Sequence, residues 1–150
     1  MATIHTAGTE IIRSAHFEEV DSDVQILIFG EQHHIYTVLS VIFFCHSVSS
    51  AGNYLTMLLR GYDSKAGGAN TSPMTIFKNT SMATNSTFVW NDKFSFNGFE
   101  PADFTGPMDD ATKQNAIADQ GGTVQQLEVS CQNSADNYDV TITFIDQNNA

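Results

Sequence analysis

The C-terminal part of the chain contains two segments in which apolar and polar residues alternate. In the first, apolar residues occupy every second position from Leu127 to Cys131, and in the second they do so from Tyr138 to Phe144. Successive side chains of a strand point to opposite faces of its sheet, so a period of two predicts two half-buried strands. Residues 132–137 between them are polar or small, which predicts that the two strands pair as an antiparallel hairpin. This hairpin indicates a small all-β domain and is predicted to form the edge that completes it.

Strand signals with turn-forming residues between them also precede this pair. They lie at residues 9–13, 24–29, 35–46, 54–60, 74–77 and 86–96. About eight short antiparallel strands predict a β-sandwich or jelly roll. The 150 residues are most economically one domain. The acidic segment 14–23 is predicted to be a solvated loop, because it lacks the ligand spacing of a calcium-binding helix–loop–helix.

Three segments lack strand character. Residues 1–8 are small and polar, and we expect a flexible N-terminal arm. Residues 61–73 are rich in Gly, Ser, Ala and Asn, and the insertion 97–120 is interrupted by proline and glycine. The helix-forming residues within 108–118 allow one short helix in this insertion. Both long segments are candidates for loops that contact a partner.

The segment 35–46 is the most apolar of the chain, and both of its predicted faces are apolar. This pattern is unusual for an antiparallel strand that has one face in water. The strand is therefore either central and covered on both sides, or buried on one side by another subunit. In the second case, the predicted subunit interface consists of Tyr36, Val38, Ile42 and Phe44.

The charge balance limits the kinds of partner. The chain has 6 Lys and Arg against 17 Asp and Glu, a net charge of −11. Nucleic-acid binding relies on clustered cations, so we expect neither nucleic acid nor an anionic membrane surface as a partner. The apolar segment 35–45 is much shorter than the roughly 20 residues of a membrane-spanning helix. The N-terminus lacks the pattern of a signal peptide, so we expect synthesis in a cytoplasm without membrane insertion.

Residues that could bind a metal are present but poorly spaced. His33, His34, His46 and Cys45 include imidazole and thiolate ligands, but they lack the spacing of a zinc site. In a regular strand, Cys45 and His46 point to opposite faces and cannot share an ion. We expect no metal and no cofactor.

The sequence also offers little for catalysis. It contains no Gly-x-Ser-x-Gly motif, and Cys45 and Cys131 lie within apolar strands, where buried reduced thiols are expected. Candidates for paired carboxylates, as in glycoside hydrolases, are found in the loop-like insertion. These are Glu100, Asp103, Asp109 and Asp110. Acidic residues are common in such loops, so we expect that the protein is not an enzyme.

An aromatic set shares one strand phase. Its members are Phe88, Trp90, Phe94 and Phe96, with the sequence Asn-Asp-Lys between Trp90 and Phe94. Such a set either stacks on sugars or belongs to the core, and its period of two beside an apolar strand favours the core. The interruption predicts a bulge or a tight corner.

The order and character of these segments resemble small β-sandwich virion proteins of tailed bacteriophages. The resemblance covers roughly residues 24–146. It is carried by the apolar strand and polar turn 35–50, the returning strand 54–60, the run Thr87–Phe94, the pair Gly121-Gly122 that leads into Leu127–Val129, and the terminal run Asp139–Phe144. No catalytic or ligand motif is part of it.

The resemblance implies a structural role in a symmetric assembly. The first hypothesis is a capsid decoration, cement or head–tail accessory protein of the virion, made in the host cytoplasm. It would form a homo-oligomer, with a trimer as the first expectation, and contact the major capsid protein or other virion proteins. The alternative hypothesis is a receptor- or carbohydrate-binding module of a fibre or adhesin, with segments 61–73 and 97–120 at its tip and Trp90 as a sugar platform.

Overall fold

The computed structural model describes residues 10–61, 73–99 and 123–148, and it contains nine β-strands. Their bounds are β1 Glu10–Val20, β2 Gln25–Phe29, β3 His34–Ser47, β4 Leu55–Arg60, β5 Met74–Asn79, β6 Thr87–Trp90, β7 Phe94–Asn97, β8 Gln126–Cys131 and β9 Asn137–Asn148. No helix occurs in these ranges, and hence none that is long and apolar enough to cross a membrane. The predicted arm 1–8 and the predicted helix within 97–120 lie outside the described residues.

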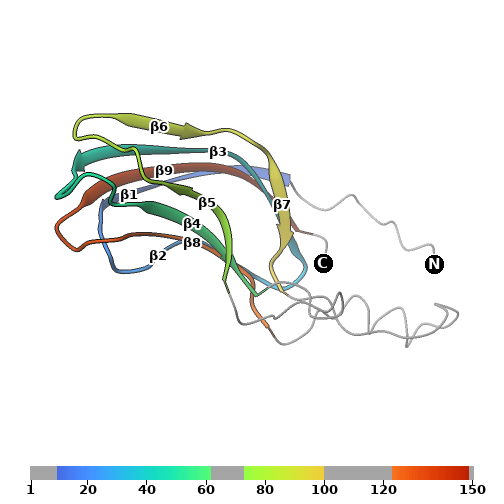
Figure 1. The fold of residues 1–150 in the computed structure, drawn as a ribbon. Helices are drawn as coiled ribbons and strands as arrows, with labels where there is room; N and C mark the ends of the chain where they lie inside the picture. The colour runs from blue at the N-terminus through green and yellow to red at the C-terminus, as the bar shows by residue number, and fades with distance from the viewer. Residues whose placement is uncertain (1–9, 62–72, 100–122, 149–150) are drawn as a thin grey trace, which may run out of the picture.

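The strands form two antiparallel sheets that pack face to face (Figure 1). Sheet A has the order β1-β9-β3-β6, with β7 also paired to β3, and sheet B has the order β2-β8-β4-β5. The chain changes sheets at every connection between consecutive strands except β4 to β5 and β6 to β7. This order is that of a jelly roll, in which β6 and β7 together fill one strand position. The predicted all-β sandwich is therefore confirmed.

The predicted C-terminal hairpin is wrong. β8 and β9 do alternate between buried and more exposed residues, but β8 lies in sheet B and β9 in sheet A. Each is an interior strand of its sheet, so neither forms an edge. Two strands that face each other across a sandwich bury alternate residues just as a hairpin does, so the pattern does not reveal which strands pair.

A buried polar cluster fixes the crossing from β8 to β9. Asp136 is 1% exposed, and its carboxylate accepts hydrogen bonds from the backbone and hydroxyl of Ser49, at 2.8 and 2.9 Å, and from the amide of Asn53. Ser49 and Asn53 belong to the connection between β3 and β4, which also changes sheets. The two crossings are thus joined at this end of the sandwich. A buried carboxylate needs such partners, because burial without them is costly.

Strand β1 is longer than predicted. It continues to Val20 through most of the predicted acidic loop, and pairs with β9 in regular register from Glu10 to Phe17. The strand turns Ala15 and Phe17 toward the core and leaves Ser14 and His16 outside. A bulge follows, where Glu19 adopts a φ of 57°. Polar residues on the outer side of an edge strand gave this segment the composition of a loop.

Strand β3 is the centre of sheet A, between β9 on one side and β6 and β7 on the other. A register shift between Val38 and Ser40 interrupts its pairing with β9. Before the shift, Tyr36 and Val38 point inward, and after it Val41 and Phe43 do so. A bulge adds one residue to one strand, so the side chains that follow change faces.

The aromatic set of residues 88–96 belongs to the core, as its period of two in the sequence predicted. Phe96 is buried, and Phe88, Trp90 and Phe94 pack against the core cluster. The interruption at residues 91–93 divides the segment into β6 and β7, and both pair with β3. The core therefore extends along the whole length of β3.

Two glycines allow the turn after β2 to pack closely against the backbone that follows β7. A Cβ atom on Gly30 would collide with the carbonyls of Gly98 and Gln125, and one on Gly98 would collide with the carbonyl of Glu31. The close approach is secured by backbone hydrogen bonds from Gly30 to Gln125 and from Gln125 to Gly98, both 2.9 Å long. Only glycine permits this approach, which places Glu31 beside the site described next.

Candidate functional site

The long sides of the sandwich differ in how they are closed. Where β5 lies opposite β6, the ring of Phe77 stacks on Trp90, with centroids 5.2 Å apart, and also contacts Phe43 and Phe88. These rings fill the space between the two sheets at this side. The aromatic cluster therefore closes the sandwich here.

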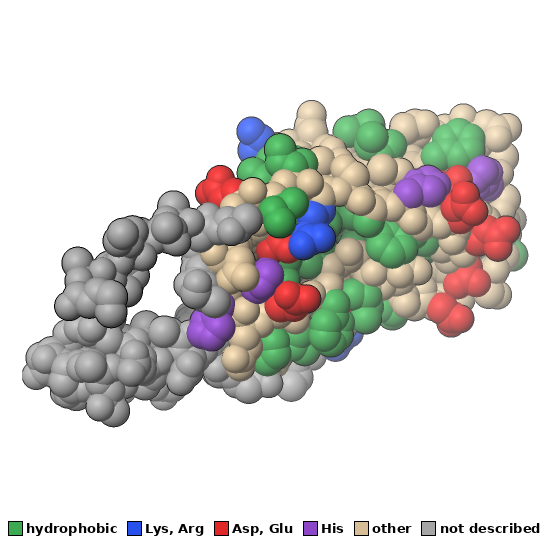
Figure 2. Space-filling model, turned by 180° about the vertical axis from the view of Figure 1, so that it is seen from behind, with side chains coloured by type: hydrophobic (Ala, Val, Ile, Leu, Met, Phe, Trp, Pro, Cys, Tyr) green, Lys and Arg blue, Asp and Glu red, His purple; other side chains and the backbone are tan. Residues whose placement is uncertain are grey.

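The opposite side, between the edge strands β1 and β2, is open. It carries or adjoins four of the exposed large hydrophobic residues of the described chain, namely Ile11 (44% exposed), Ile12 (70%), Val24 (54%) and Phe29 (61%). Figure 2 views this side and shows hydrophobic side chains between two groups of charged and histidine side chains. Exposed apolar residues that gather in one region are typical of an interaction surface.

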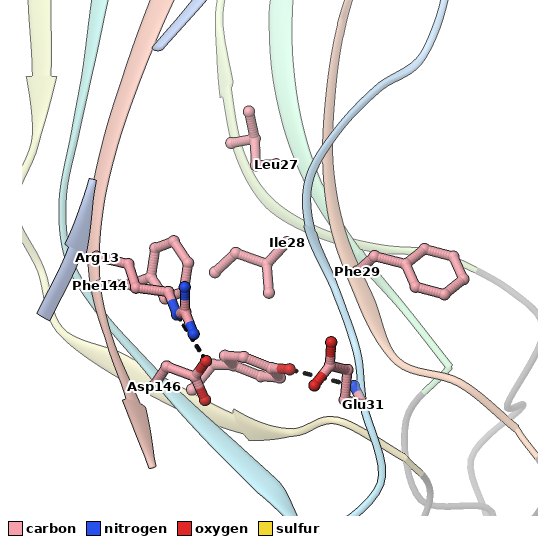
Figure 3. A pocket seen from close by; sticks show the side chains of 8 residues that line it. Arg13, Leu27, Ile28, Phe29, Glu31, Phe144 and Asp146 are labelled. Atoms are coloured by element: carbon pink, nitrogen blue, oxygen red, sulfur yellow. Dashed lines mark hydrogen bonds and ion pairs between the residues drawn. The ribbon is translucent and has the colours of Figure 1, made fainter. Parts of the chain in front are cut away.

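A cleft of about 240 Å³ lies between these two strands (Figure 3). Its apolar lining comes from Leu27, Ile28 and Phe144, while Phe29 points away on the outer side of β2. The polar lining comes from Arg13, Glu31 and Asp146, together with Tyr36. The cleft therefore combines apolar side chains with a charged end, and its exposed lining is more polar than apolar.

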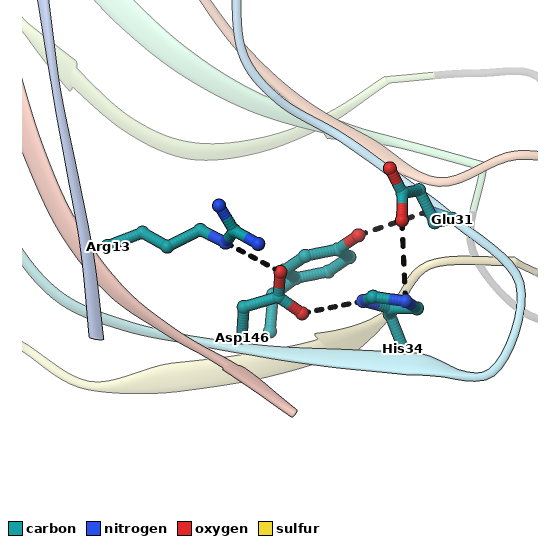
Figure 4. Close-up of polar contacts among 5 residues, drawn as sticks. Arg13, Glu31, His34 and Asp146 are labelled. Atoms are coloured by element: carbon teal, nitrogen blue, oxygen red, sulfur yellow. Dashed lines mark hydrogen bonds and ion pairs between the residues drawn. The ribbon is translucent and has the colours of Figure 1, made fainter. Parts of the chain in front are cut away.

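A chain of polar contacts forms the charged end of the cleft (Figure 4). Arg13 donates from Nε to Oδ2 of Asp146 at 2.8 Å, and Nδ1 of His34 lies 2.6 Å from Oδ1 of the same carboxylate. Nε2 of His34 lies 3.3 Å from Glu31. Asp146 is almost buried, whereas the side chains of Arg13 and Glu31 are 52% and 69% exposed. The outer members can thus reach a partner, and the inner carboxylate holds them in place.

Tyr36 forms part of the floor beneath this polar chain. Its hydroxyl oxygen accepts a hydrogen bond from the backbone N–H of Glu31, at 3.1 Å, and its ring packs against Phe96 and Phe144. Burial raises the pKa of Tyr36 to about 12, with the nearby carboxylates of Asp146 and Glu31 adding to the increase. The hydroxyl is therefore neutral near pH 7, and it positions the turn after β2.

The arrangement suits binding more than bond-breaking chemistry. Two carboxylates, a guanidinium and an imidazole satisfy one another, and the described lining of the cleft contains no cysteine or serine. The cysteines lie in the core, and burial raises the pKa of the Cys131 thiol to about 12. A thiol with so high a pKa is a poor nucleophile. That the protein is not an enzyme remains a prediction.

The structure divides the four residues of the predicted subunit interface. Tyr36 and Val38 are 3% and 0% exposed and point into the core, whereas Ile42 is 39% exposed on the outer side of β3. Phe44 is half-buried on that same outer side, where its ring meets His46 edge-on at 4.8 Å. The expectation that all four share one face is wrong, because the bulge in β3 reverses the faces. Contact of Ile42 and Phe44 with another subunit stays a prediction.

The outward side of sheet A, which we call the sheet A face, carries no Asp, Glu, Lys or Arg in its three described middle rows. Residues directly opposite in neighbouring strands share a face. The rows are Ile12, Ile145, Thr37 and Ser95; then Ser14, Thr143 and Ser40; then His16, Thr141, Ile42 and Val89. Val89 is 49% exposed beside Ile42. In a chain of net charge −11, this face is unusually neutral.

The proposed metal ligands are not brought together. Cys45 is buried, whereas His46 is exposed and lies 2.7 Å from Asp139, so the prediction that they point to opposite faces is confirmed. His34 contacts Asp146 at the far end of the same strand. Within the described ranges, no three residues of the types that bind metals are grouped closely enough to hold an ion.

The structure describes only part of the predicted carbohydrate-binding site. Trp90 is stacked on Phe77 in the closed side of the sandwich, and its Nε1 is buried there, so its ring is not an open platform. Most of the proposed tip, residues 62–72 and 100–122, lies outside the described residues. The candidate carboxylates Glu100, Asp103, Asp109 and Asp110 lie outside them too.

Sequence reasoning missed the polar chain in the cleft. The residue that could have revealed it is Asp146, which lies at the same inward-facing alternate positions of β9 as Tyr138, Val140 and Phe144. A charged residue in an inward phase requires a buried partner. The partner, Arg13, is distant in sequence, at the end of the strand predicted for residues 9–13.

Comparisons with known proteins give distant structural similarities. No family model matches the chain, and no curated protein does. A protein of the Bacillus endospore appendages, described as disulfide-linked pili, aligns over 99% of this chain and 96% of its own length, with 8% identity and a TM-score of 0.43. A protein of infectious bursal disease virus, strain Gx, aligns over 94% of this chain with 9% identity and a TM-score of 0.43.

A third structure, of T=1 particles derived from the same virus, aligns over 99% of this chain with 11% identity and a TM-score of 0.40. This chain covers 32% and 38% of the two viral proteins, about a third of their length. All three are structures of assembled particles or fibres. Similarity at this level supports no statement about the function of this chain.

Proposed function

We propose that the protein is a structural subunit of a symmetric assembly. In its specific form, the proposal is a capsid decoration, cement or head–tail accessory protein of a bacteriophage virion, which stabilises the particle through contacts between subunits. Its partners are other copies of the chain, with a trimer as the first expectation, and the major capsid protein or other virion proteins. It requires no catalysis and no cofactor.

The neutral sheet A face is the observation that carries the proposal. Copies of a chain with net charge −11 repel one another, so they can associate closely only through surfaces that contain few carboxylates. The middle rows of the sheet A face meet this condition, and Ile42 and Val89 are exposed within them. Burial of such apolar area supplies the driving force for association, at roughly 25 cal/mol per Å².

The arrangement of hydrophobic residues on β3 supports the same interpretation. A central strand of a half-solvated sheet normally carries polar residues on its outer side. Here, Ile42 and Phe44 follow the polar Thr37 and Ser40 on that side, and the adjacent β6 adds Val89. A neighbouring subunit would remove these three side chains from water.

Sedimentation velocity on the full-length chain tests which face mediates assembly. We expect Ile42→Lys to weaken self-association by at least about tenfold, because a buried unpaired charge costs several kcal/mol. Thr75→Lys is the matched control, since it places the same charge on an exposed position of sheet B. Equal association of the two variants would contradict a role for the sheet A face. Circular dichroism of both variants establishes that they are folded.

A further inference from the structure

The two edge strands beside the cleft differ in how well they are protected against pairing with another strand. β1 carries Glu10, Arg13, Glu18 and Glu19, and it ends in a bulge. Charges, an inward-pointing charged residue and a bulge are the features by which natural sheets prevent edge-to-edge pairing. β1 has all three.

Strand β2 differs from β1 in its lack of charges, since its own pairing also contains a register shift, between Ile26 and Ile28. Residues 24–30, which include the whole of β2, contain no charged residue and no proline. Val24 and Phe29, just before and at the end of the strand, are 54% and 61% exposed. β2 pairs with β8 on one side and, within the described chain, with no strand on the other. An uncharged apolar edge is a template for an added strand.

The space beside β2 also lacks the filling that the other side has. There, Phe77 and Trp90 close the gap between the sheets, whereas here the cleft remains above Ile28 and Phe144. Its volume of about 240 Å³ accommodates one or two aliphatic side chains. A strand added to β2 would direct alternate side chains into this cleft.

We propose that residues 2–7 of a neighbouring copy add to the free edge of β2 and place Ile4 in the cleft. The segment, Ala-Thr-Ile-His-Thr-Ala, contains no carboxylate, in contrast to the strongly acidic chain as a whole. Six extended residues span about 20 Å, and the five residues of β2 span about 17 Å, so the lengths match. This proposal rests on the proposed function, since it requires that copies of the chain meet.

A neighbouring copy fits better than the same copy. Residues 2–7 are joined to β1, which belongs to sheet A, while β2 belongs to sheet B. Packed sheets lie about 10 Å apart, and the three Cα–Cα steps from Ala7 to Glu10 reach about 10 Å only when Gly8 and Thr9 are fully extended, which leaves no residue for a turn. A tight reversal at Gly8-Thr9 would instead lay residues 2–7 beside β1 in sheet A, because strands joined by a two-residue turn lie about 5 Å apart.

Mixing two defective full-length variants tests this contact directly. The donor defect is Ile4→Asp, with Ile4→Val as its conservative control. The acceptor defect is Val24→Lys with Phe29→Lys, and its matched control is Met74→Lys with Thr75→Lys on the opposite edge of sheet B. All four acceptor and control positions are exposed, so the fold should tolerate lysine there.

Each defect alone should weaken self-association at least tenfold in sedimentation velocity, whereas both controls should associate like the wild type. An equimolar mixture of the two defective variants should form a two-copy species, because one variant retains a functional β2 edge and the other a functional N-terminal segment. No such species in the mixture, or unaltered association of Ile4→Asp, would overturn the proposal.

A cross-link identifies the contact and its direction. Ile4→Cys combined with Ile28→Cys, at a position that lines the cleft, should give, on mild oxidation, a disulfide that joins different copies. A disulfide within single copies would overturn the proposal in favour of self-occupation. The two proposals can fail separately. If the wild type associates and Ile42→Lys abolishes association while Ile4→Asp leaves it unchanged, then the proposed function stands and the contact of residues 2–7 with β2 is wrong. A wild type that neither associates nor binds virus particles contradicts the proposed function itself.

Discussion

The carboxylate of Asp139 shows how a single residue couples this fold to pH. Burial alone would raise its pKa, but hydrogen bonds from His46 and from the backbone N–H of Glu19, together with the charges of His46 and His16, outweigh burial and lower the pKa below 3.8. Since the pKa in the folded state lies below the unfolded value, the ionised group stabilises the fold above pH 3.8. That contribution is lost as the pH falls through the folded-state value.

Asp139→Asn should therefore reduce the free energy of unfolding at pH 7 by about 0.5 kcal/mol, as is usual for a partly exposed pair. At pH 2.5, the difference from the wild type should be smaller. Urea unfolding at the two pH values measures both. Asp23→Asn removes the same charge from an exposed position and is the control. A difference that stays constant between the two pH values would contradict a lowered pKa of Asp139.

Individual residues were predicted best where burial alone decides their state. Cys45 and Cys131 lie in the core as reduced thiols, as their apolar strands indicated. Residues whose role depends on a distant partner could not be predicted. Arg13 and Asp146 are 133 positions apart, and only the pairing of β1 with β9 brings them together. A sequence pattern contains no information on that pairing.

At the scale of elements, most strand positions followed from the sequence, and their partners did not. Alternation predicted β8 and β9 well, but it could not reveal that they lie in opposite sheets. The bulge in β3 had no signal either, since residues 35–46 are apolar in both phases. For this reason, two residues of the predicted interface, Tyr36 and Val38, lie in the core.

The aromatic closure between β5 and β6 should be a main source of stability for the isolated chain. Phe77 contacts Phe43, Phe88 and Trp90, so Phe77→Ala removes the centre of this cluster. We expect a loss of about 3 kcal/mol in the free energy of unfolding, as for other large-to-small substitutions in cores.

Urea unfolding measures this loss, and Met74→Ala provides the control on the same strand. Met74 is 43% exposed, so its truncation should change stability by less than about 0.5 kcal/mol. Similar losses for the two variants would mean that the aromatic rings do not close the sandwich in solution.

At the scale of the whole molecule, three features point toward association. The sheet A face is neutral in its middle rows, the β2 edge is uncharged, and the cleft beside that edge is open. The sequence predicts a subunit contact on the segment 35–46, and for Ile42 and Phe44 that contact stays a prediction. Sequence reasoning could not anticipate the cleft, which exists only because the edges of two different sheets lie opposite each other.

The mass of the purified full-length chain in solution tests the central claim most directly. Multi-angle light scattering over a hundredfold range of concentration should show a closed oligomer, with a mass of three 16.4 kDa chains as the first expectation. A larger closed ring would also agree with a structural subunit. A single species of 16.4 kDa at every concentration, with no binding to virus particles, would contradict it.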